Sequence, residues 1–196
     1  MSKLLDRAVE ELAKLPGIGE RTALRLALHL LRQPAEQVSA LSESIDRFRR
    51  EVKYCKKCNN LSDTDICPIC ADSSRDKSII CVVEQVKDVL SIEHTGQYKG
   101  VYHVLGGVIS PMQGIAPSDL KIDLLLENIS QGGVQEVILA LNTSIEGETT
   151  SYYLARKLKD LNVKVSTIAR GIGFGDELDY ADEITLVHAI HNRLQM

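Results

Sequence analysis

The sequence predicts an α/β protein in which a mainly parallel sheet follows a helical N-terminal segment and a four-cysteine knuckle. Three observations predict this class: helical periodicity before residue 53, two Cys-x-x-Cys pairs, and apolar strands that alternate with helical stretches from residue 78 onward. We therefore expect four segments, at 1–53, 54–77, 78–170 and 171–196, the last of them a C-terminal helical tail. Because the 196 residues include no tryptophan, the core must be largely aliphatic.

Two amphipathic helices joined by a glycine-containing turn are predicted at the start of the chain. The first ends at Pro16, and the second runs over residues 20–33. Gly17 and Gly19 in the turn Leu15-Pro-Gly-Ile-Gly permit a tight bend, and their backbone N–H groups can approach a phosphate closely. The pattern is typical of a helix-hairpin-helix, which grips a nucleic-acid backbone without reading its sequence.

Basic residues of the second helix extend this candidate DNA site. Arg21 and Arg25 lie one helical turn apart, and Arg32 falls near the same face, so the three charges could follow a row of phosphates. The candidate DNA-binding residues are therefore Gly17, Gly19, Arg21 and Arg25. The alternative is an ordinary helical hairpin with solvated arginines.

A third helix is predicted after Pro34. Its apolar stripe is either core or a subunit contact, and it comprises Val38, Leu41, Ile45, Phe48 and Val52. A basic cluster runs from the end of this helix into the knuckle, either as a solvated surface or facing DNA: Arg47, Arg49, Arg50, Lys53, Lys56 and Lys57.

The knuckle contains Cys55 with Cys58 and Cys67 with Cys70. Two such pairs can turn four thiolates toward one ion, which is typical of a structural zinc finger with one Zn²⁺ per chain. Two disulfides or a redox motif are the alternatives, but the zinc site explains both pairs at once. Cys81 lies inside an apolar strand, so we interpret it as a buried small residue and not as a fifth ligand.

The remainder of the chain alternates strands with helices. Strands are predicted at 78–83, 101–105, 136–141 and 163–169, with helices at 120–129 and 149–161. This order predicts a mainly parallel sheet with helices on both faces, whose ligands gather beyond the carboxyl ends of the strands. Glu84 and the predicted loop 142–148, with Glu146 and Glu148, both fall at that edge.

The segment 171–175 is glycine-rich, but it lacks the spacing and the lysine of a phosphate-binding P-loop, so we interpret its glycines as turn residues. A terminal helix is expected within 176–193. Asp179, Asp182 and Glu183 suit the positive end of its dipole. His188 and His191 are too isolated to predict a metal site.

Charge is distributed unevenly along the chain. Residues 1–60 carry 12 Lys or Arg against 8 Asp or Glu, whereas residues 61–196 carry 11 against 19. A polyanion should therefore bind the first part. We expect a cytoplasmic protein, because no apolar run approaches the length of a membrane span and the N-terminus lacks the hydrophobic core of a signal peptide.

Taken together, these motifs resemble known families. An acid that closes the first strand and an acid-x-acid element after a later one are similar to a Toprim domain, the module of topoisomerases and primases. With the hairpin LPGIGERTALRLA, the knuckle and the phrases GVYHVLGGVISPMQGIAP, IEGETTSYYLARKL and ARGIGFGDELDYADEITL, essentially the whole chain resembles the RecR family of bacterial recombination mediators.

This resemblance implies a non-enzymatic DNA-repair protein that forms a ring-like tetramer and works with RecO and RecF to load RecA onto single-stranded DNA. It also implies that Arg21 and Arg25 contact DNA, that the tail helps to assemble the ring, and that the Toprim region is linked to RecO binding.

The Toprim acids have two possible uses. In enzymes of that superfamily the carboxylates hold Mg²⁺ for phosphoryl transfer. This chain offers Glu84, Glu146 and Glu148, but Glu146-Gly-Glu148 stands where aspartates are usual, and no tyrosine stands in a recognisable nucleophilic context. We therefore expect partner binding by these acids. The alternatives are a Mg²⁺-dependent Toprim nuclease or primase-like enzyme, and a zinc-dependent adaptor that does not contact DNA.

Overall fold

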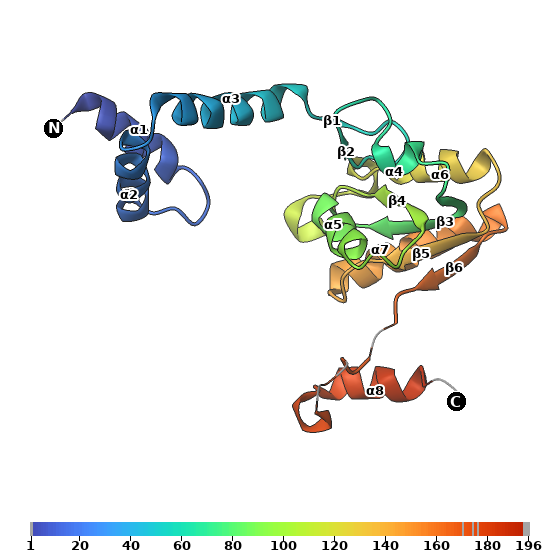
Figure 1. The fold of residues 1–196 in the computed structure, drawn as a ribbon. Helices are drawn as coiled ribbons and strands as arrows, with labels where there is room; N and C mark the ends of the chain where they lie inside the picture. The colour runs from blue at the N-terminus through green and yellow to red at the C-terminus, as the bar shows by residue number, and fades with distance from the viewer. Residues whose placement is uncertain (1, 170, 174, 176, 194–196) are drawn as a thin grey trace. The chain divides into compact units, whose positions relative to one another are not determined.

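The computed structural model describes residues 2–169, 171–173, 175 and 177–193. The chain divides into two compact units, Met1–Val52 and Lys53–Met196, which we describe separately (Figure 1). Within the described residues, no helix is both long and apolar enough to cross a membrane.

The first unit consists of three helices, α1 (Lys3–Ala13), α2 (Glu20–Leu31) and α3 (Ala35–Glu51). α1 and α2 pack against each other across the predicted turn, in which Gly17 has a φ of 79°. α3 begins directly after Pro34, whose fixed φ suits the start of a helix. Among the described residues of this unit, only Ala23 and Ala27 are buried.

The second unit begins with the knuckle. Its strands β1 (Lys53–Tyr54) and β2 (Leu61–Ser62) pair antiparallel, and the short helix α4 (Pro68–Ala71) follows. Pro68 occupies the first turn of α4, where its missing N–H has no cost. Both cysteine pairs therefore lie at bends of the chain.

A four-stranded sheet forms the centre of the second unit, with strands β3 (Asp76–Val83), β4 (Gly100–Val104), β5 (Glu136–Ala140) and β6 (Lys164–Thr167). The strand order is β4-β3-β5-β6, and all three pairings are parallel. This arrangement confirms the predicted α/β class, and it places the ends of β3 and β5 side by side because Val83 pairs with Ala140.

Helices cover both faces of the sheet, as predicted (Figure 1). On one face, α6 (Ile122–Ser130) and α7 (Ile145–Leu158) pack on apolar side chains that include Val82 and Leu139. On the other face, α5 (Val86–His94) packs on a smaller cluster around Cys81 and Tyr102. Alternate residues of β3 enter the two clusters, as the two-residue period of a strand requires.

One helix was missed, and the start of another was predicted wrongly. α5 was not predicted, and α7 begins at Ile145 instead of Thr149. Glu146 and Glu148 therefore lie in the first turn of a helix and not in a loop, because the Ser144 side chain caps that helix by accepting a hydrogen bond from the backbone N–H of Gly147 at 3.1 Å. Short 3₁₀ turns occur at Pro111–Gln113, Pro117–Asp119, Lys159–Leu161 and Leu178–Tyr180.

The tail contains α8 (Glu183–His191), which confirms the terminal helix. Asp182 caps it, since its carboxylate accepts hydrogen bonds from the backbone N–H and hydroxyl of Thr185 at 2.9 and 2.7 Å. The predicted glycine-rich turn 171–175 and the domain limit at residue 170 lie partly outside the described residues, which exclude 170, 174 and 176.

Candidate functional site

The four knuckle cysteines converge, as their spacing predicts. Cys55, Cys58, Cys67 and Cys70 are all buried, and their sulfurs lie within 4.8 Å of one another. Sulfurs bound to one tetrahedral zinc ion lie about 3.8 Å apart, given Zn–S bonds of about 2.3 Å. The four thiols therefore fit a closed zinc site, in which every coordination position is filled by the protein.

Local hydrogen bonds hold these sulfurs in place. The backbone N–H of Cys67 donates to the sulfur of Cys55 at 3.3 Å, and that of Cys70 donates to Cys67 at 3.4 Å. Hydrogen bonds from Cys58 and Cys70 lower the pKa of Cys67, whereas hydrogen bonding to Cys67 raises the pKa of Cys58. A bound zinc ion would favour the thiolate at each position.

The knuckle is joined to the edge of the sheet at β4. The backbone N–H of Val104 donates to the carbonyl of Cys58 at 2.8 Å, and the side chain of Asn59 donates to the carbonyl of Val104 at 2.8 Å. Asn59 itself has a φ of 59°, a left-handed conformation that asparagine tolerates well. The metal site therefore covers an otherwise open edge of the sheet.

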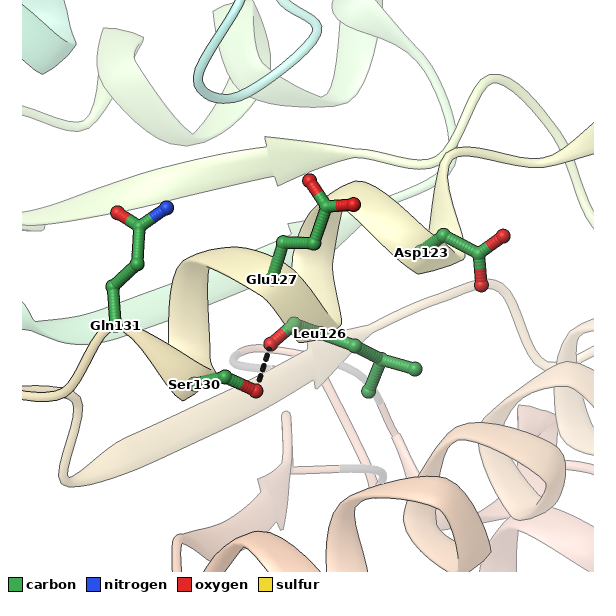
Figure 2. Close-up of a pocket in the computed structure, with 5 residues that line it drawn as sticks. All are labelled: Asp123, Leu126, Glu127, Ser130 and Gln131. Carbon is green, nitrogen blue, oxygen red and sulfur yellow. Dashed lines mark hydrogen bonds between the residues drawn. The ribbon is translucent and has the colours of Figure 1, made fainter.

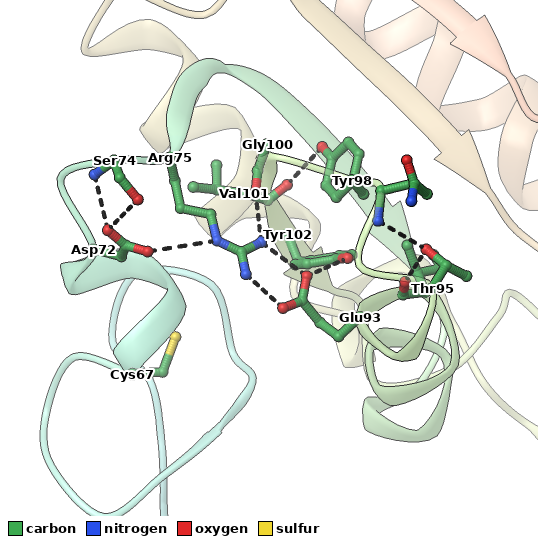
Figure 3. Close-up of polar contacts among 12 residues, drawn as sticks. Cys67, Asp72, Ser74, Arg75, Glu93, Thr95, Tyr98, Gly100, Val101 and Tyr102 are labelled. Carbon is green, nitrogen blue, oxygen red and sulfur yellow. Dashed lines mark hydrogen bonds and ion pairs between the residues drawn. The ribbon is translucent and has the colours of Figure 1, made fainter.

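A polar network ties the segment after α4 to the sheet (Figure 3). Arg75 donates to both carboxylate oxygens of Glu93 on α5 and to the carbonyl of Gly100 at 3.2 Å. Tyr102 on β4 also donates to Glu93 at 2.8 Å, while Asp72 lies 3.9 Å from Arg75. This network was not predicted, because no local spacing pairs residues 75 and 93.

The predicted hairpin forms in the first unit. The backbone N–H of Ile18 donates to the carbonyl of Leu15 at 3.1 Å, which closes the turn. Gly19 is the N-cap of α2. The space beside both turn glycines is open, since a methyl group added at Gly17 or Gly19 would meet no atom within 4 Å. No side chain caps α2, so the N–H groups of its first turn remain available to an anion.

The α2 arginines lie together, as their spacing predicts. They line a shallow hollow of about 400 Å³ whose lining residues are Arg21, Leu24, Arg25, Leu28, His29 and Arg32. We call this group the arginine face. His29 was not predicted to belong to it, although its position one turn after Arg25 contains that information.

Much of the basic cluster between α3 and the knuckle is paired with acids. Arg47 and Arg50 bind Glu51 and Asp46 on their own helix, at 3.1 and 2.8 Å. In the knuckle, Lys56 donates to Asp65. The pairs are exposed and offset the positive charge locally, which favours the solvated-surface interpretation for these three residues.

At the carboxyl edge of the sheet, Glu84 directly follows β3, and Glu146 and Glu148 occupy the start of α7. Glu84 accepts a hydrogen bond from the backbone N–H of Asn142 at 2.9 Å. These glutamates are not among the metal-ligand clusters of the described residues, where the four cysteines form the only group of three or more candidate ligands within mutual reach. The three carboxylates therefore do not converge on one point in this structure.

Another hollow, of about 670 Å³, lies along α6 (Figure 2). Asp123, Leu126, Glu127, Ser130 and Gln131 line it, and all five belong to one helix or its C-cap. The hollow is therefore an open helix surface, without groups from a second element that could enclose a ligand.

Comparison with known proteins places the whole chain. Residues 5–48 match the helix-hairpin-helix model of RecR, residues 52–72 its four-cysteine zinc finger domain, residues 78–169 a Toprim domain, and residues 171–194 the C-terminal region of RecR. The chain is 59% identical to "Recombination protein RecR" of Bacteroides thetaiotaomicron over 192 residues, which cover 98% of this chain and 94% of the relative. The chain belongs to the RecR family.

Two further relatives named "Recombination protein RecR" are similar to this chain over nearly its whole length. Identity is 55% with the relative from Porphyromonas gingivalis over 192 residues, or 98% and 93% of the two chains. It is 53% with the relative from Flavobacterium johnsoniae over 193 residues, or 98% and 94%. The match to the RecR zinc finger domain and the four converging sulfurs together support a zinc site in this RecR-family chain.

Proposed function

We propose that this chain is a non-catalytic mediator of recombinational DNA repair in the bacterial cytoplasm. In this proposal it binds DNA, assembles into a ring-like homotetramer, and acts with RecO and RecF to load RecA onto single-stranded DNA. The observation that carries the DNA-binding step is the open glycine turn beside the arginine face. Membership of the RecR family supports the repair role.

The proposed DNA contact uses two kinds of donor. Backbone N–H groups around Gly19 and the start of α2 would hold one phosphate, because the helix dipole is positive there. Arg21 and Arg25 would contact neighbouring phosphates from the same helix face. Such contacts are weak singly and sensitive to salt, so several hairpins in one assembly would bind far more tightly than one.

Exposed apolar side chains of the first unit support self-assembly. Leu31, Ile45 and Phe48 are 77%, 61% and 60% exposed, although their helices form a unit with only two buried residues among those described. Much of the predicted α3 stripe is therefore not covered within its own unit. An apolar groove of about 1050 Å³ between α1, α2 and α3 would accept side chains from a second copy. The tail adds exposed Ile184, Val187 and Ile190.

The acidic edge of the sheet supports a protein partner better than a phosphate substrate. Carboxylates there would repel DNA, whereas Lys or Arg side chains of a partner would complement them. Ile145, at the first position of α7, is 83% exposed and would add apolar contact beside Glu146. We propose that this surface binds RecO and that Glu146 contributes directly.

Charge reversal on the arginine face tests the DNA-binding step. In the variant Arg21→Glu with Arg25→Glu, single-stranded DNA affinity measured by fluorescence anisotropy should fall by about tenfold or more at 100 mM salt. The slope of log affinity against log salt should also become shallower by about 1.4, since each phosphate contact contributes about 0.7 on single-stranded DNA. Zinc content and circular dichroism should remain unchanged, because both arginines are exposed on α2.

A matched variant, Lys157→Glu with Lys159→Glu, changes the net charge equally in the second unit and should retain DNA affinity within about threefold. Equal weakening by both double variants would mean that only the net charge matters, and unchanged affinity in the Arg21 and Arg25 variant would remove the hairpin from the mechanism. Incubation with labelled DNA and Mg²⁺ tests the enzymatic alternative, since cleavage or synthesis lost in Glu84→Ala would overturn the non-catalytic role.

A further inference from the structure

Glu84 is fixed at the point where β3 ends. Its backbone carbonyl accepts a hydrogen bond from the N–H of Gly106 at 2.9 Å, which continues the pairing of β3 with the chain after β4. Its carboxylate accepts from the backbone N–H of Asn142, also at 2.9 Å. The side chain therefore spans from the end of β3 to the end of β5, and holds the residue that opens the β5–α7 turn.

The side chain of Asn142 connects this turn with the start of α7. The amide oxygen of Asn142 accepts from the backbone N–H and the hydroxyl of Ser144, at 3.0 and 2.5 Å. The Ser144 oxygen in turn accepts from the N–H of Gly147 and caps the helix. A continuous series of hydrogen bonds therefore leads from the Glu84 carboxylate to the first turn of α7.

Close packing makes the turn sensitive to displacement of Asn142. A methyl group on Gly147 would collide with the carbonyl and amide oxygens of Asn142, so the helix start and the turn are in contact there. From the other side, the hydroxyl of Thr150 donates to the carbonyl of Glu146 at 2.7 Å and accepts from the N–H of Ile109 at 2.9 Å. Glu146 is thus placed on a helical turn that is constrained from both sides.

We infer that Glu84 is a positioning residue: its carboxylate acts by holding Asn142, and so sets the helical turn from which Glu146 meets a partner. This inference rests on the proposed partner-binding role of the edge. Both residues are acids at the same edge, but in this inference Glu146 contacts the partner and Glu84 holds the turn in place. What matters at position 84 is then an oxygen that accepts the Asn142 hydrogen bond, and not a negative charge.

Conservative and non-conservative variants separate these two roles. Glu84→Gln keeps an accepting oxygen and loses the charge, whereas Glu84→Ala loses both. Calorimetric titration with purified RecO should give Glu84→Gln an affinity within about threefold of the parent and Glu84→Ala one about tenfold weaker, the value of one lost hydrogen bond. Glu146→Gln should weaken binding by about tenfold or more, because that charge meets the partner.

Gly147→Ala provides a matched test that changes no charge. It should reproduce the Glu84→Ala defect, since the added methyl group displaces Asn142 from the opposite side. Hydrogen exchange supplies a readout that needs no partner: amides of residues 142 and 147–149 should exchange about tenfold faster in Glu84→Ala and at the parental rate in Glu84→Gln. Zinc content and DNA affinity of all four variants serve as checks on folding.

Two outcomes separate the positioning role of Glu84 from the proposed binding of RecO at this edge. If Glu84→Gln loses RecO binding as fully as Glu84→Ala while exchange is unchanged in both, the partner reads the charge of Glu84 and the positioning role is overturned. If Glu146→Gln has no effect on RecO binding, the proposed partner surface fails, and the exchange experiment still decides whether Glu84 holds the turn.

Discussion

Arg75 and Glu93 form a bidentate ion pair, which joins the segment that follows the zinc knuckle to helix α5. The guanidinium nitrogens lie 2.8 and 2.5 Å from the two carboxylate oxygens (Figure 3). Hydrogen bonding from Arg75 lowers the pKa of Glu93, so the pair stays ionised at neutral pH. Only 16% of the Arg75 side chain and 27% of the Glu93 side chain are exposed, so water replaces neither partner easily.

Removing one member of this pair should be costly. Arg75→Met keeps much of the side-chain volume but leaves the Glu93 carboxylate with Tyr102 as its remaining side-chain partner in the network. We expect the free energy of unfolding to fall by about 2 kcal/mol in urea titrations, because an enclosed charge loses its counter-ion. Lys164→Met is the control. It breaks an ion pair whose lysine is largely exposed, and should cost less than about 1 kcal/mol. Equal losses would show that enclosure adds nothing to the Arg75 pair.

Loss of a knuckle thiol should release zinc and loosen the edge of the sheet. Cys58→Ser removes one of four ligands, and the Cys58 carbonyl is also the acceptor for the Val104 N–H. We expect the purified variant to lose its stoichiometric zinc by atomic absorption, and its Val104 amide to exchange faster with solvent. Cys81→Ala is the control. Burial raises the pKa of Cys81 to about 12, so it remains a thiol, and its loss should leave the zinc content at one per chain. A fully zinc-loaded Cys58→Ser protein would contradict four-cysteine ligation.

His103 should make stability depend on pH. Burial lowers its pKa to about 4, and its Nε2–H donates to the carbonyl of Lys121 at 2.7 Å. The unfolded chain has the ordinary pKa of about 6.5. Because the folded value is the lower one, the stabilisation is fully present above pH 6.5 and is lost as the pH falls toward 4. Between pH 7.5 and 5 the loss should be about 2 kcal/mol.

The comparison with His103→Gln isolates this effect. Acid also protonates zinc-bound thiolates, but that loss is common to both proteins. The difference in unfolding free energy between parent and variant, measured by urea titration at each pH, should therefore narrow by about 2 kcal/mol between pH 7.5 and 5. A constant difference would mean that the imidazole is already accessible to protons in the folded state.

The parts of the fold that follow from local pattern could be predicted from the sequence. The spacing of the cysteines predicts that their four sulfurs converge. A short, continuous apolar run such as 78–83 is typical of a buried strand in a parallel sheet. α5 was missed because Val89 is its only fully buried residue, so its helical period is weak. The start of α7 was misplaced because Gly147 was interpreted as a loop residue, whereas its missing side chain makes room for Asn142 within a helix.

The features that could not be predicted are contacts between residues far apart in the sequence. The Arg75–Glu93 pair and the Asn59–Val104 hydrogen bond join residues 18 and 45 positions apart. No period or motif connects such positions, and their proximity exists only once the sheet has formed. The Glu84–Asn142 bond belongs to the same class. Both segments were predicted at the carboxyl edge of the sheet, but only the structure identifies which atoms meet there.

The two hairpin glycines should separate folding from DNA contact. Gly17 has a φ of 79°, so Gly17→Ala strains the turn and should lower the free energy of unfolding by about 1 kcal/mol. Gly19 has a φ of −82°, which any residue adopts, and a methyl group there meets no protein atom within 4 Å. Gly19→Ala should therefore lower the free energy of unfolding by only about 0.5 kcal/mol, which reflects the preference for glycine over alanine at an N-cap.

Its DNA affinity should nevertheless fall by about three- to tenfold, because the methyl group would stand between a phosphate and the N–H groups at the start of α2. Urea unfolding and fluorescence anisotropy on the same preparations measure the two effects. Stable Gly19→Ala protein that binds DNA as well as the parent would exclude a close backbone approach at the turn and leave the arginine face as the whole contact.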